Sequence, residues 1–312
     1  MDLRRAILAA ALAVVLTAAC PAGTAAHVTA HRLVFASWNV RNYLLRPVMD
    51  TDGRVLTPSK TAESVDAVVS TLLRIAPDIV GLCEIGSERD LADLQKRLRS
   101  GGLDLPHRTW VGGADRERHL ALLSKYPLES VQNDTTSGFK LDGLPNRVRR
   151  GLLDCTIAVR PDFKLRVVGA HLKSRRTAAD FDQADFRREE SLVLREHLGG
   201  ILQADAASRL LVFGDFNDSK NSPVVAGLLG RRGDGDSLEL LPLADKMGDH
   251  WTYHWAESDE YSRVDHIMVS NALRPLIVRS ASRIHREPSW LKASDHRPLV
   301  VTIGIPRTKV AP

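Results

Sequence analysis

Six short polar motifs are the parts of this sequence that could do chemistry, because each follows or interrupts an apolar run. They are, in chain order, Ser37-Trp38-Asn39, Glu84, His171, Gly214-Asp215-Phe216-Asn217, Asp265-His266 and Ser294-Asp295-His296. One such placement is typical of a turn or a loop. Six of them indicate a shared site, because open α/β architectures build their sites at the C-terminal ends of strands.

The residue types of these motifs fit metal-assisted hydrolysis of a phosphoester. Carboxylate and amide oxygens are hard ligands that suit Mg²⁺, Mn²⁺ or Ca²⁺ rather than a metal that prefers thiolates. Histidine can exchange protons near neutral pH, because its unperturbed pKa is about 6.5. A cation that neutralises developing charge and a base that prepares water are what such a reaction needs.

Apolar runs bounded by turn residues predict the strands that position these motifs. The expected strands cover residues 33–40, 78–84, 119–124, 151–159, 165–171, 209–214, 264–270, 276–282 and 299–303. Helices are expected over residues 57–75, 87–100 and 180–198. So many strands with so few helices do not fit a parallel βαβ series. The pattern predicts an α/β fold of two packed sheets with helices outside.

The first 26 residues predict a secretory signal peptide. Arg4 and Arg5 precede an apolar run over residues 6–20, and small residues follow as far as Ala26. The run is shorter than the roughly 20 residues that span a bilayer. We expect cleavage near Ala26 and a secreted or periplasmic protein. The alternative is a lipid anchor on Cys20, although the preceding leucine lies one position too early for a good lipobox.

The rest of the chain has the composition of one globular domain. It is 44% hydrophobic and 26% charged, and no internal low-complexity linker divides it. We expect the domain over residues 31–306 and a tail over 307–312, as a monomer without a membrane span. The net charge of +5 suits a polyanionic partner, but a solvated basic surface explains it equally well. Cys83 and Cys155 lie in apolar runs and are expected as buried free thiols, with a disulfide as the alternative.

The order and spacing of the motifs resemble the endonuclease/exonuclease/phosphatase superfamily. The matching segments are Trp38-Asn39-Val40, Cys83-Glu84-Ile85, Gly169-Ala170-His171-Leu172, Gly214-Asp215-Phe216-Asn217, Arg263-Val264-Asp265-His266 and Ser294-Asp295-His296. The resemblance runs from about residue 33 to residue 303. It implies a four-layer α/β/β/α sandwich, in which two mixed, mainly antiparallel sheets pack face to face with helices outside. It also implies a phosphoester hydrolase that uses Mg²⁺, or alternatively Mn²⁺ or Ca²⁺.

The resemblance implies roles for the matching residues. Glu84 would be the main metal ligand, Asn39 would lie close to the metal or the phosphate, and Asp295 would be the last acidic ligand. The catalytic set would be His171, Asp215, Asn217, Asp265 and His296. In that set, Asp265 would orient His296, and Asp215 with Asn217 would position the water and the transition-state oxygens. Which of the two histidines is the acid stays open.

Basic residues beside the motifs are candidates for binding substrate phosphates. They are Arg41, Arg150, Lys173, Arg175 and Arg176. Such residues bind backbone phosphates without reading sequence, and ordinary solvated charge is the alternative. Some repair-type members of the superfamily carry an acidic residue at the position of Arg41, which makes activity on abasic sites less expected here.

The leading hypothesis is a secreted nuclease that cuts DNA or RNA with little sequence preference. The alternative enzyme is a phosphatase or a phospholipid phosphodiesterase, similar to inositol phosphatases or sphingomyelinases. A third reading is a binding protein without catalysis, which the presence of all six motifs disfavours.

Overall fold

The computed structural model describes residues 29–175 and 182–307. The expected signal peptide, Cys20, Arg176 and residues 308–312 of the expected tail lie outside the described residues. In the described part of the chain, no helix is long and apolar enough to cross a membrane.

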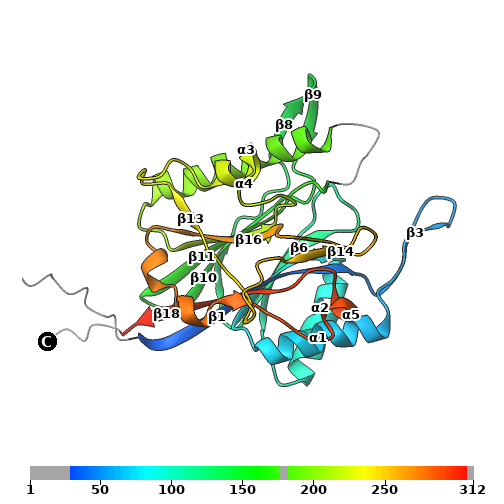
Figure 1. Cartoon of the computed structure of the whole chain (residues 1–312), viewed down its shortest axis with the longest axis horizontal. Helices are drawn as coiled ribbons and strands as arrows, with labels where there is room; N and C mark the ends of the chain where they lie inside the picture. Colours follow the sequence, from blue (N-terminus) through cyan, green and yellow to red (C-terminus); the bar gives the residue numbers. More distant parts are fainter. Residues whose placement is uncertain (1–28, 176–181, 308–312) are drawn as a thin grey trace, which may run out of the picture.

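A six-stranded mixed sheet contributes one inner layer of the fold (Figure 1). Its strands, in spatial order, are β17 (Arg283–Ile284), β18 (Leu299–Pro306), β1 (Thr29–Tyr43), β4 (Ile79–Ile85), β6 (His119–Ser124) and β5 (His107–Val111). Neighbouring strands run antiparallel, except that β1 and β4 are parallel. Asn39 pairs with Cys83 in this parallel ladder, so Asn39 and Glu84 lie at the same edge of the sheet.

The second six-stranded sheet is built in the same way. Its strands, in spatial order, are β13 (Leu238–Leu240), β16 (Asp265–Ser270), β12 (Leu210–Asp215), β11 (Phe163–His171), β10 (Leu152–Arg160) and β7 (Leu128–Val131). Only β11 and β12 are parallel, and their last residues, His171 and Asp215, are paired. Because β12 contacts both β1 and β4, the ends of the two parallel pairs meet between the sheets.

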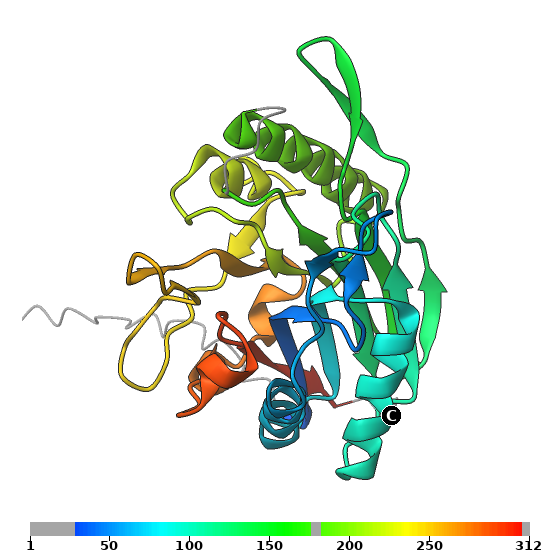
Figure 2. The ribbon, with the colours of Figure 1, turned by 90° about the vertical axis from the view of Figure 1, so that its right-hand side faces the viewer.

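Helices cover the outer face of each sheet (Figures 1 and 2). The first sheet carries α1 (Ala62–Ile75) and α2 (Glu88–Ser100), with α5 (Trp290–Ala293) packed on α1. The second carries α3 (Gln183–Ala204) and α4 (Pro223–Leu228). The longer helices each bury an apolar stripe, such as Val65, Val68 and Leu72 of α1. The predicted four-layer α/β/β/α sandwich is therefore confirmed.

The core between the sheets depends on two glycines that make room for one aromatic ring. A Cβ atom on Gly81 of β4 would lie 2.3 Å from Cζ of Phe213, and one on Gly169 of β11 would lie 2.6 Å from it. The Phe213 ring therefore fills the space at both strands and packs on Phe35, with 5.5 Å between the ring centroids. This packing sets the spacing of the two sheets next to the predicted site.

Both cysteines of the described chain lie in the core and are free thiols, as expected. Cys83 and Cys155 are buried on different sheets, and no disulfide joins them. Burial raises the pKa of both thiols, that of Cys155 to about 12. Their role is therefore packing.

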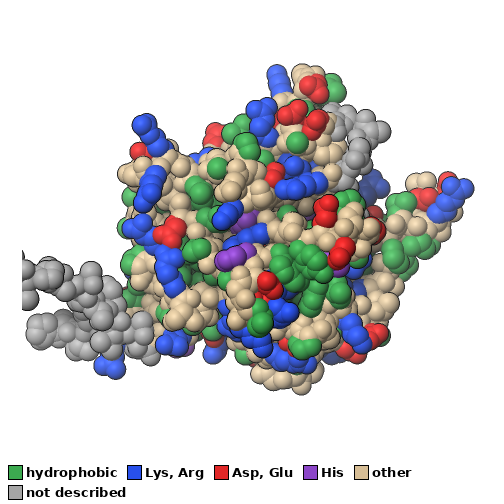
Figure 3. All heavy atoms as spheres, viewed as in Figure 1, with side chains coloured by type: hydrophobic (Ala, Val, Ile, Leu, Met, Phe, Trp, Pro, Cys, Tyr) green, Lys and Arg blue, Asp and Glu red, His purple; other side chains and the backbone are tan. Residues whose placement is uncertain are grey.

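Among the described residues, three two-stranded hairpins lie outside the large sheets. They are formed by β2 (Val48–Met49) with β3 (Val55–Thr57), β8 (Gly138–Leu141) with β9 (Leu144–Arg147), and β14 (Tyr253–Trp255) with β15 (Glu260–Ser262). The β2–β3 hairpin projects from the body of the molecule (Figures 1 and 3). Its exposed apolar side chains are Met49, Val55 and Leu56.

The predicted strand over residues 276–282 is wrong. Two short 3₁₀ turns, η1 (Arg274–Leu276) and η2 (Arg279–Ala281), occupy that segment. Ile277 forms one bridge to Ile303 of β18, but the Ser282 hydroxyl then donates to the carbonyl of Val278 and closes a local turn. The helix expected over 57–75 begins later, at Ala62, because the Thr61 side chain caps it by accepting from the Ser64 N–H. The helix expected over 180–198 covers Gln183–Ala204.

We expect Gly81→Ala to lower the free energy of unfolding by about 1–3 kcal/mol, because the new methyl group overpacks against the Phe213 ring. Gly200→Ala is the matched control: Gly200 lies on α3, and a methyl group there would have nothing within 4 Å, so the stability of this variant should stay equal or rise. Urea denaturation measures both. If Gly81→Ala costs as much stability in a Phe213→Leu background as it does in the wild type, the ring is not what excludes the methyl group.

Candidate active site

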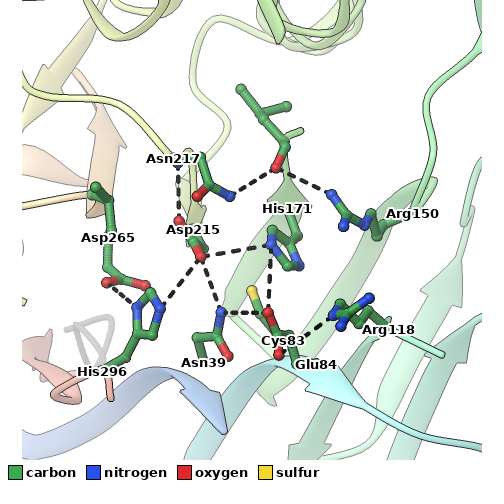
Figure 4. Close-up of polar contacts among 12 residues, drawn as sticks. Asn39, Cys83, Glu84, Arg118, Arg150, His171, Asp215, Asn217, Asp265 and His296 are labelled. Atoms are coloured by element: carbon green, nitrogen blue, oxygen red, sulfur yellow. Dashed lines mark hydrogen bonds and ion pairs between the residues drawn. The ribbon is translucent and has the colours of Figure 1, made fainter. Parts of the chain in front are cut away.

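The buried carboxylate of Asp215 lies at the centre of the site (Figure 4). Its Oδ2 accepts a hydrogen bond from Asn39 Nδ2 at 3.0 Å and lies 3.6 Å from His171 Nε2 and 3.7 Å from His296 Nε2. Its Oδ1 accepts from the backbone N–H of Asn217 at 2.9 Å. One carboxylate therefore contacts four of the residues that the sequence singled out.

Gly214 allows the strand to bring Asp215 to this place. Its φ of +154° is accessible to glycine, and a Cβ atom there would lie 1.8 Å from the carbonyl oxygen of Ala170 on β11. A larger residue would push β12 away from β11. The glycine of the Gly-Asp-Phe-Asn motif thus has a steric function beside the catalytic candidates.

Glu84 is held at the edge of the cavity by hydrogen bonds to both carboxylate oxygens. Oε1 accepts from Asn39 Nδ2 at 3.2 Å, and Oε2 accepts from the backbone N–H of Asn42 at 3.0 Å. The Arg118 guanidinium lies 3.8 Å from Oε2. Glu84 has a left-handed backbone with φ +63°, an unfavourable conformation for a non-glycine residue. Together, these contacts fix the position of the Glu84 side chain.

A strained turn after Asn39 supplies one of these contacts. Arg41 and Asn42 both have φ of +48°, and this turn interrupts the pairing of β1 with β4. The Lys60 ammonium donates to the carbonyls of Val40 and Arg41, each at 3.0 Å. The turn also brings the Arg41 side chain within 3.5 Å of Asp295. Lys60 therefore stabilises the conformation that presents the Asn42 N–H to Glu84.

His296 is fixed from both sides. Asp265 Oδ2 lies 2.7 Å from its Nδ1, so Nε2 points toward Asp215. The Trp38 indole donates to the His296 carbonyl at 2.9 Å, and the Ser294 hydroxyl both donates to the carbonyl of Asn39 and accepts from the His296 N–H. The structure thus brings together Asp265 and His296, the pair that the sequence predicted.

The two histidines differ in charge because their surroundings differ. Burial lowers the pKa of His171, and the positive charges of Arg150 and His296 hold it well below its usual range. Burial would also lower the pKa of His296, but the carboxylates of Asp265 and Asp215 outweigh it and raise this pKa to about 10. Burial and the charge of Asp265 raise the pKa of Asp215. At neutral pH, His171 is therefore neutral and His296 is an imidazolium.

A cavity of about 420 Å³ opens onto this centre, and basic side chains line it: Arg41, Arg118, Arg150 and Lys173. Arg150 is buried and donates to Asp115 at 2.8 Å, and the Lys173 backbone N–H donates to the buried carboxylate of Glu190 at 2.6 Å. Three of the predicted phosphate-binding residues, Arg41, Arg150 and Lys173, thus lie at the cavity. The cavity wall is cationic although its floor is acidic.

Arg175 lies differently from what the sequence suggested. Its guanidinium donates to the carbonyl of Asn217 and to the Asp218 carboxylate, and it does not line the cavity. Asp218 also pairs with Arg187. Arg175 is therefore engaged with its own protein in this structure, and Arg176 lies outside the described residues.

The sequence did not identify Arg118, Asp115 or Tyr253, which also line the cavity. The Tyr253 ring lies 4.7 Å from the His296 ring, centroid to centroid. Arg118 and Asp115 belong to a charged loop before β6 that matches no motif, so only its acidic and basic composition could have drawn attention to it. His266 has a structural role: it is buried, and its Nε2 lies 2.9 Å from the carbonyl oxygen of Asp218.

The cavity offers oxygen donors that fit a hard divalent cation. Glu84 and Asp295 line it, with side chains 15% and 17% exposed, and the Asn39 amide holds Glu84 toward it. Asp215, Asp265 and His296 also form a compact cluster of potential ligand atoms. In that cluster, however, Asp265 already binds the imidazolium of His296. The oxygens of the first group therefore remain open to a cation, whereas the second group is engaged by an internal hydrogen bond.

The Asp265–His296 pair makes stability depend on pH in metal-free protein. His296 has a pKa of about 10 when folded and about 6.5 when unfolded. The pair's contribution is therefore complete below about pH 6.5 and is lost as the pH rises toward 10. We expect Asp265→Asn to destabilise the protein by on the order of 3 kcal/mol at pH 6 and by clearly less at pH 10, measured by urea denaturation in EDTA.

Asp259→Asn is the control for this experiment, because Asp259 contacts His254 at 3.1 Å while its side chain is 84% exposed. It should change stability by less than about 1 kcal/mol at either pH. An equal loss for Asp265→Asn at pH 6 and pH 10 would show that no charged pair forms.

Comparisons with known proteins agree with this geometry. The model of the Endonuclease/Exonuclease/phosphatase family matches residues 36–296. No curated protein matches the sequence significantly. Similar solved structures include truncated Caenorhabditis elegans TDP2, at 18% identity over 89% of this chain and 99% of that chain, with a TM-score of 0.60. They also include an endonuclease/exonuclease/phosphatase from Beutenbergia cavernae DSM 12333, at 17% identity over 90% and 73%, with a TM-score of 0.61.

A third is D. rerio TDP2 complexed with a single-strand DNA product, at 18% identity over 88% of this chain and 99% of that chain, with a TM-score of 0.59. At such identities these structures show the fold. Together with the family match, the sandwich and its site lead to one conclusion. The chain belongs to the Endonuclease/Exonuclease/phosphatase family of phosphoester hydrolases, which generally depend on a divalent metal ion.

Proposed function

We propose that this protein is a secreted, divalent-metal-dependent nuclease that cuts DNA or RNA with low sequence specificity. The observation that carries the proposal is the cavity over Asp215, where Arg41, Arg118, Arg150 and Lys173 surround an acidic centre. Several separated cations around one cavity suit a substrate with several phosphates, because cationic side chains attract backbone phosphates without reading the bases. Secretion rests on the basic and apolar pattern of the first 26 residues.

The protein's own groups can supply both proton transfers of a hydrolysis. Water that attacks phosphorus must lose a proton, and the oxygen that leaves must gain one. We assign the first role to the neutral Nε2 of His171 and the second to the charged Nε2 of His296. Both atoms lie within 4 Å of Asp215 Oδ2, which can orient the water between them. A cation held by Glu84 and Asp295 would neutralise charge on the phosphate oxygens.

A phospholipid phosphodiesterase is the second candidate, because the β2–β3 hairpin exposes Met49, Val55 and Leu56. Such a cluster could contact a lipid surface. A panel of plasmid DNA, RNA, inositol phosphates and sphingomyelin vesicles, each with Mg²⁺, Mn²⁺ or EDTA, separates the candidates. We expect metal-dependent cleavage of the nucleic acids. Hydrolysis of sphingomyelin or inositol phosphates alone would overturn the nuclease proposal.

Glu84→Gln should lower the Mg²⁺-supported rate by about 10³-fold or more, because it removes the ligand charge but keeps the shape and most hydrogen bonds. The matched control is Glu257→Gln, since Glu257 is exposed and does not line the cavity. Isothermal titration with Mn²⁺ should show that Glu84→Gln alone weakens metal binding. Activity within a few fold of wild type at saturating Mg²⁺ would remove Glu84 from the ligand set.

His171→Ala and His296→Ala should each lower the rate on an oligonucleotide by about 10²-fold or more. A good leaving group needs no proton. With bis-p-nitrophenyl phosphate as the substrate, the rate of His296→Ala should therefore come close to that of the wild type, whereas the rate of His171→Ala should stay low. His107→Ala, in β5 and away from the cavity, serves as the control. The opposite pattern of restoration would exchange the two roles.

A further inference from the structure

A second cavity of about 920 Å³ lies beside the active site. Asp115 lines both cavities, so the two adjoin along the loop that precedes β6. The second cavity is bounded on its other side by the start of the β2–β3 hairpin, through Leu45 and Val48. A substrate segment that leaves the catalytic centre past Asp115 would therefore enter it.

The apolar part of this cavity is held rigidly by Trp110. Its indole donates to the carbonyl of Gly86 at 2.9 Å, and its ring packs on the His119 ring with 4.6 Å between centroids. Burial lowers the pKa of His119, so this ring adds no positive charge at neutral pH. Trp110 is half-buried and lines the cavity together with Leu44. A flat apolar group could pack here.

Three exposed arginines also line the cavity: Arg46, Arg89 and Arg116. In residues 29–175 and 182–307, none of them has a hydrogen-bonded or ion-paired side chain. The acidic residues of the wall, Asp90 and Asp115, form no ion pair with these arginines. Asp90 accepts from the backbone N–H groups of Leu45 and Ser87, and Asp115 pairs with Arg150. The cavity therefore carries three free cations around an apolar floor.

We propose that this cavity binds one or two nucleotides of a single-stranded DNA or RNA chain next to the scissile phosphate. This proposal rests on the proposed nuclease function and adds the form of its substrate. The volume lies in the range of pockets that hold nucleotide-sized ligands. Bases of a single strand are free to stack on an indole, whereas paired bases in a duplex are not. The three arginines match phosphates that repeat along the chain.

The charge pattern favours a nucleic acid over a phospholipid for this cavity. A phospholipid brings one phosphodiester, which the catalytic cavity already accommodates. The same lipid molecule would bring no further phosphate to Arg46, Arg89 and Arg116. A polynucleotide brings further phosphates on the chain that continues past the cut. Lipid binding is therefore an outcome to be tested against the proposal.

The first test compares two triple variants of equal charge. Arg46→Gln/Arg89→Gln/Arg116→Gln removes the cations of the second cavity. Arg32→Gln/Arg231→Gln/Arg232→Gln changes three exposed arginines that line neither cavity. We measure kcat/KM on single-stranded DNA and RNA oligonucleotides of increasing length, extended on either side of the cut. Bis-p-nitrophenyl phosphate is the short reference substrate, and thermal melts confirm folding.

We expect wild-type kcat/KM to rise as the oligonucleotide is extended on one side. In the first triple variant, this rise in kcat/KM should be at least tenfold smaller, mainly because KM is higher. The slope of log(kcat/KM) against log salt concentration should become shallower by up to about 2, because a single strand releases about 0.7 counterion per phosphate contact. The second triple variant should keep the gain. Equal losses in the two variants, or no gain with length in the wild type, would overturn the subsite.

The second test asks whether a base reaches Trp110. In an inactive Glu84→Gln background, binding of an oligonucleotide should quench tryptophan fluorescence, and Trp110→Phe should remove most of that quenching. Unchanged quenching in Trp110→Phe would overturn the stacking contact. Loss of sphingomyelin hydrolysis in the first triple variant, with nucleic acid cleavage intact, would assign the cavity to a lipid. If no polynucleotide is cut while bis-p-nitrophenyl phosphate is, the proposed nuclease function itself fails.

Discussion

The burial of the Asp215 carboxylate between two sheets is the interaction on which the rest of the site depends. A buried carboxylate is costly unless hydrogen bonds and opposite charges compensate it. Here Asn39 and the backbone of Asn217 donate to it, and the imidazolium of His296 lies beside it. These partners come from β1, the loop after β12 and the segment before β18. Compensation of this one buried charge therefore requires residues from distant parts of the chain to lie together.

The sheet architecture satisfies this requirement in a simple way. Each sheet is antiparallel except for one parallel pair, and the carboxyl ends of the two pairs meet. The Phe213 ring, two residues before Asp215, fixes the spacing of the sheets through Gly81 and Gly169. The same strand therefore carries a core contact and the central carboxylate. Strained backbone is concentrated here as well, at Arg41 and Glu84 among others.

Much of the fold and the site could be predicted from the sequence. Apolar runs indicate buried strands, and the polar residues that follow them indicate that the strand ends lie together at one site. The Asp265–His296 pair followed from the resemblance to a known superfamily. Arg118 escaped prediction because it lies in a loop, where no periodicity fixes a side chain's direction. Arg175 was expected to serve the substrate, but Asp218, which follows a different strand, binds it. The strand predicted over residues 276–282 is absent from the structure, because the Ser282 hydroxyl donates to the carbonyl of Val278 and closes a local turn.

The central claim is that a phosphodiester binds between His171 and His296, beside a cation held by Glu84 and Asp295. A crystal structure with Mn²⁺ and a phosphorothioate oligonucleotide tests it directly, because Mn²⁺ is located by anomalous scattering. We expect Mn²⁺ on Glu84 and Asp295, the leaving oxygen of one phosphodiester within hydrogen-bond distance of His296 Nε2, and a water within hydrogen-bond distance of His171 Nε2. Mn²⁺ bound by Asp265 in place of His296, or a phosphate that contacts neither histidine, would contradict the claim.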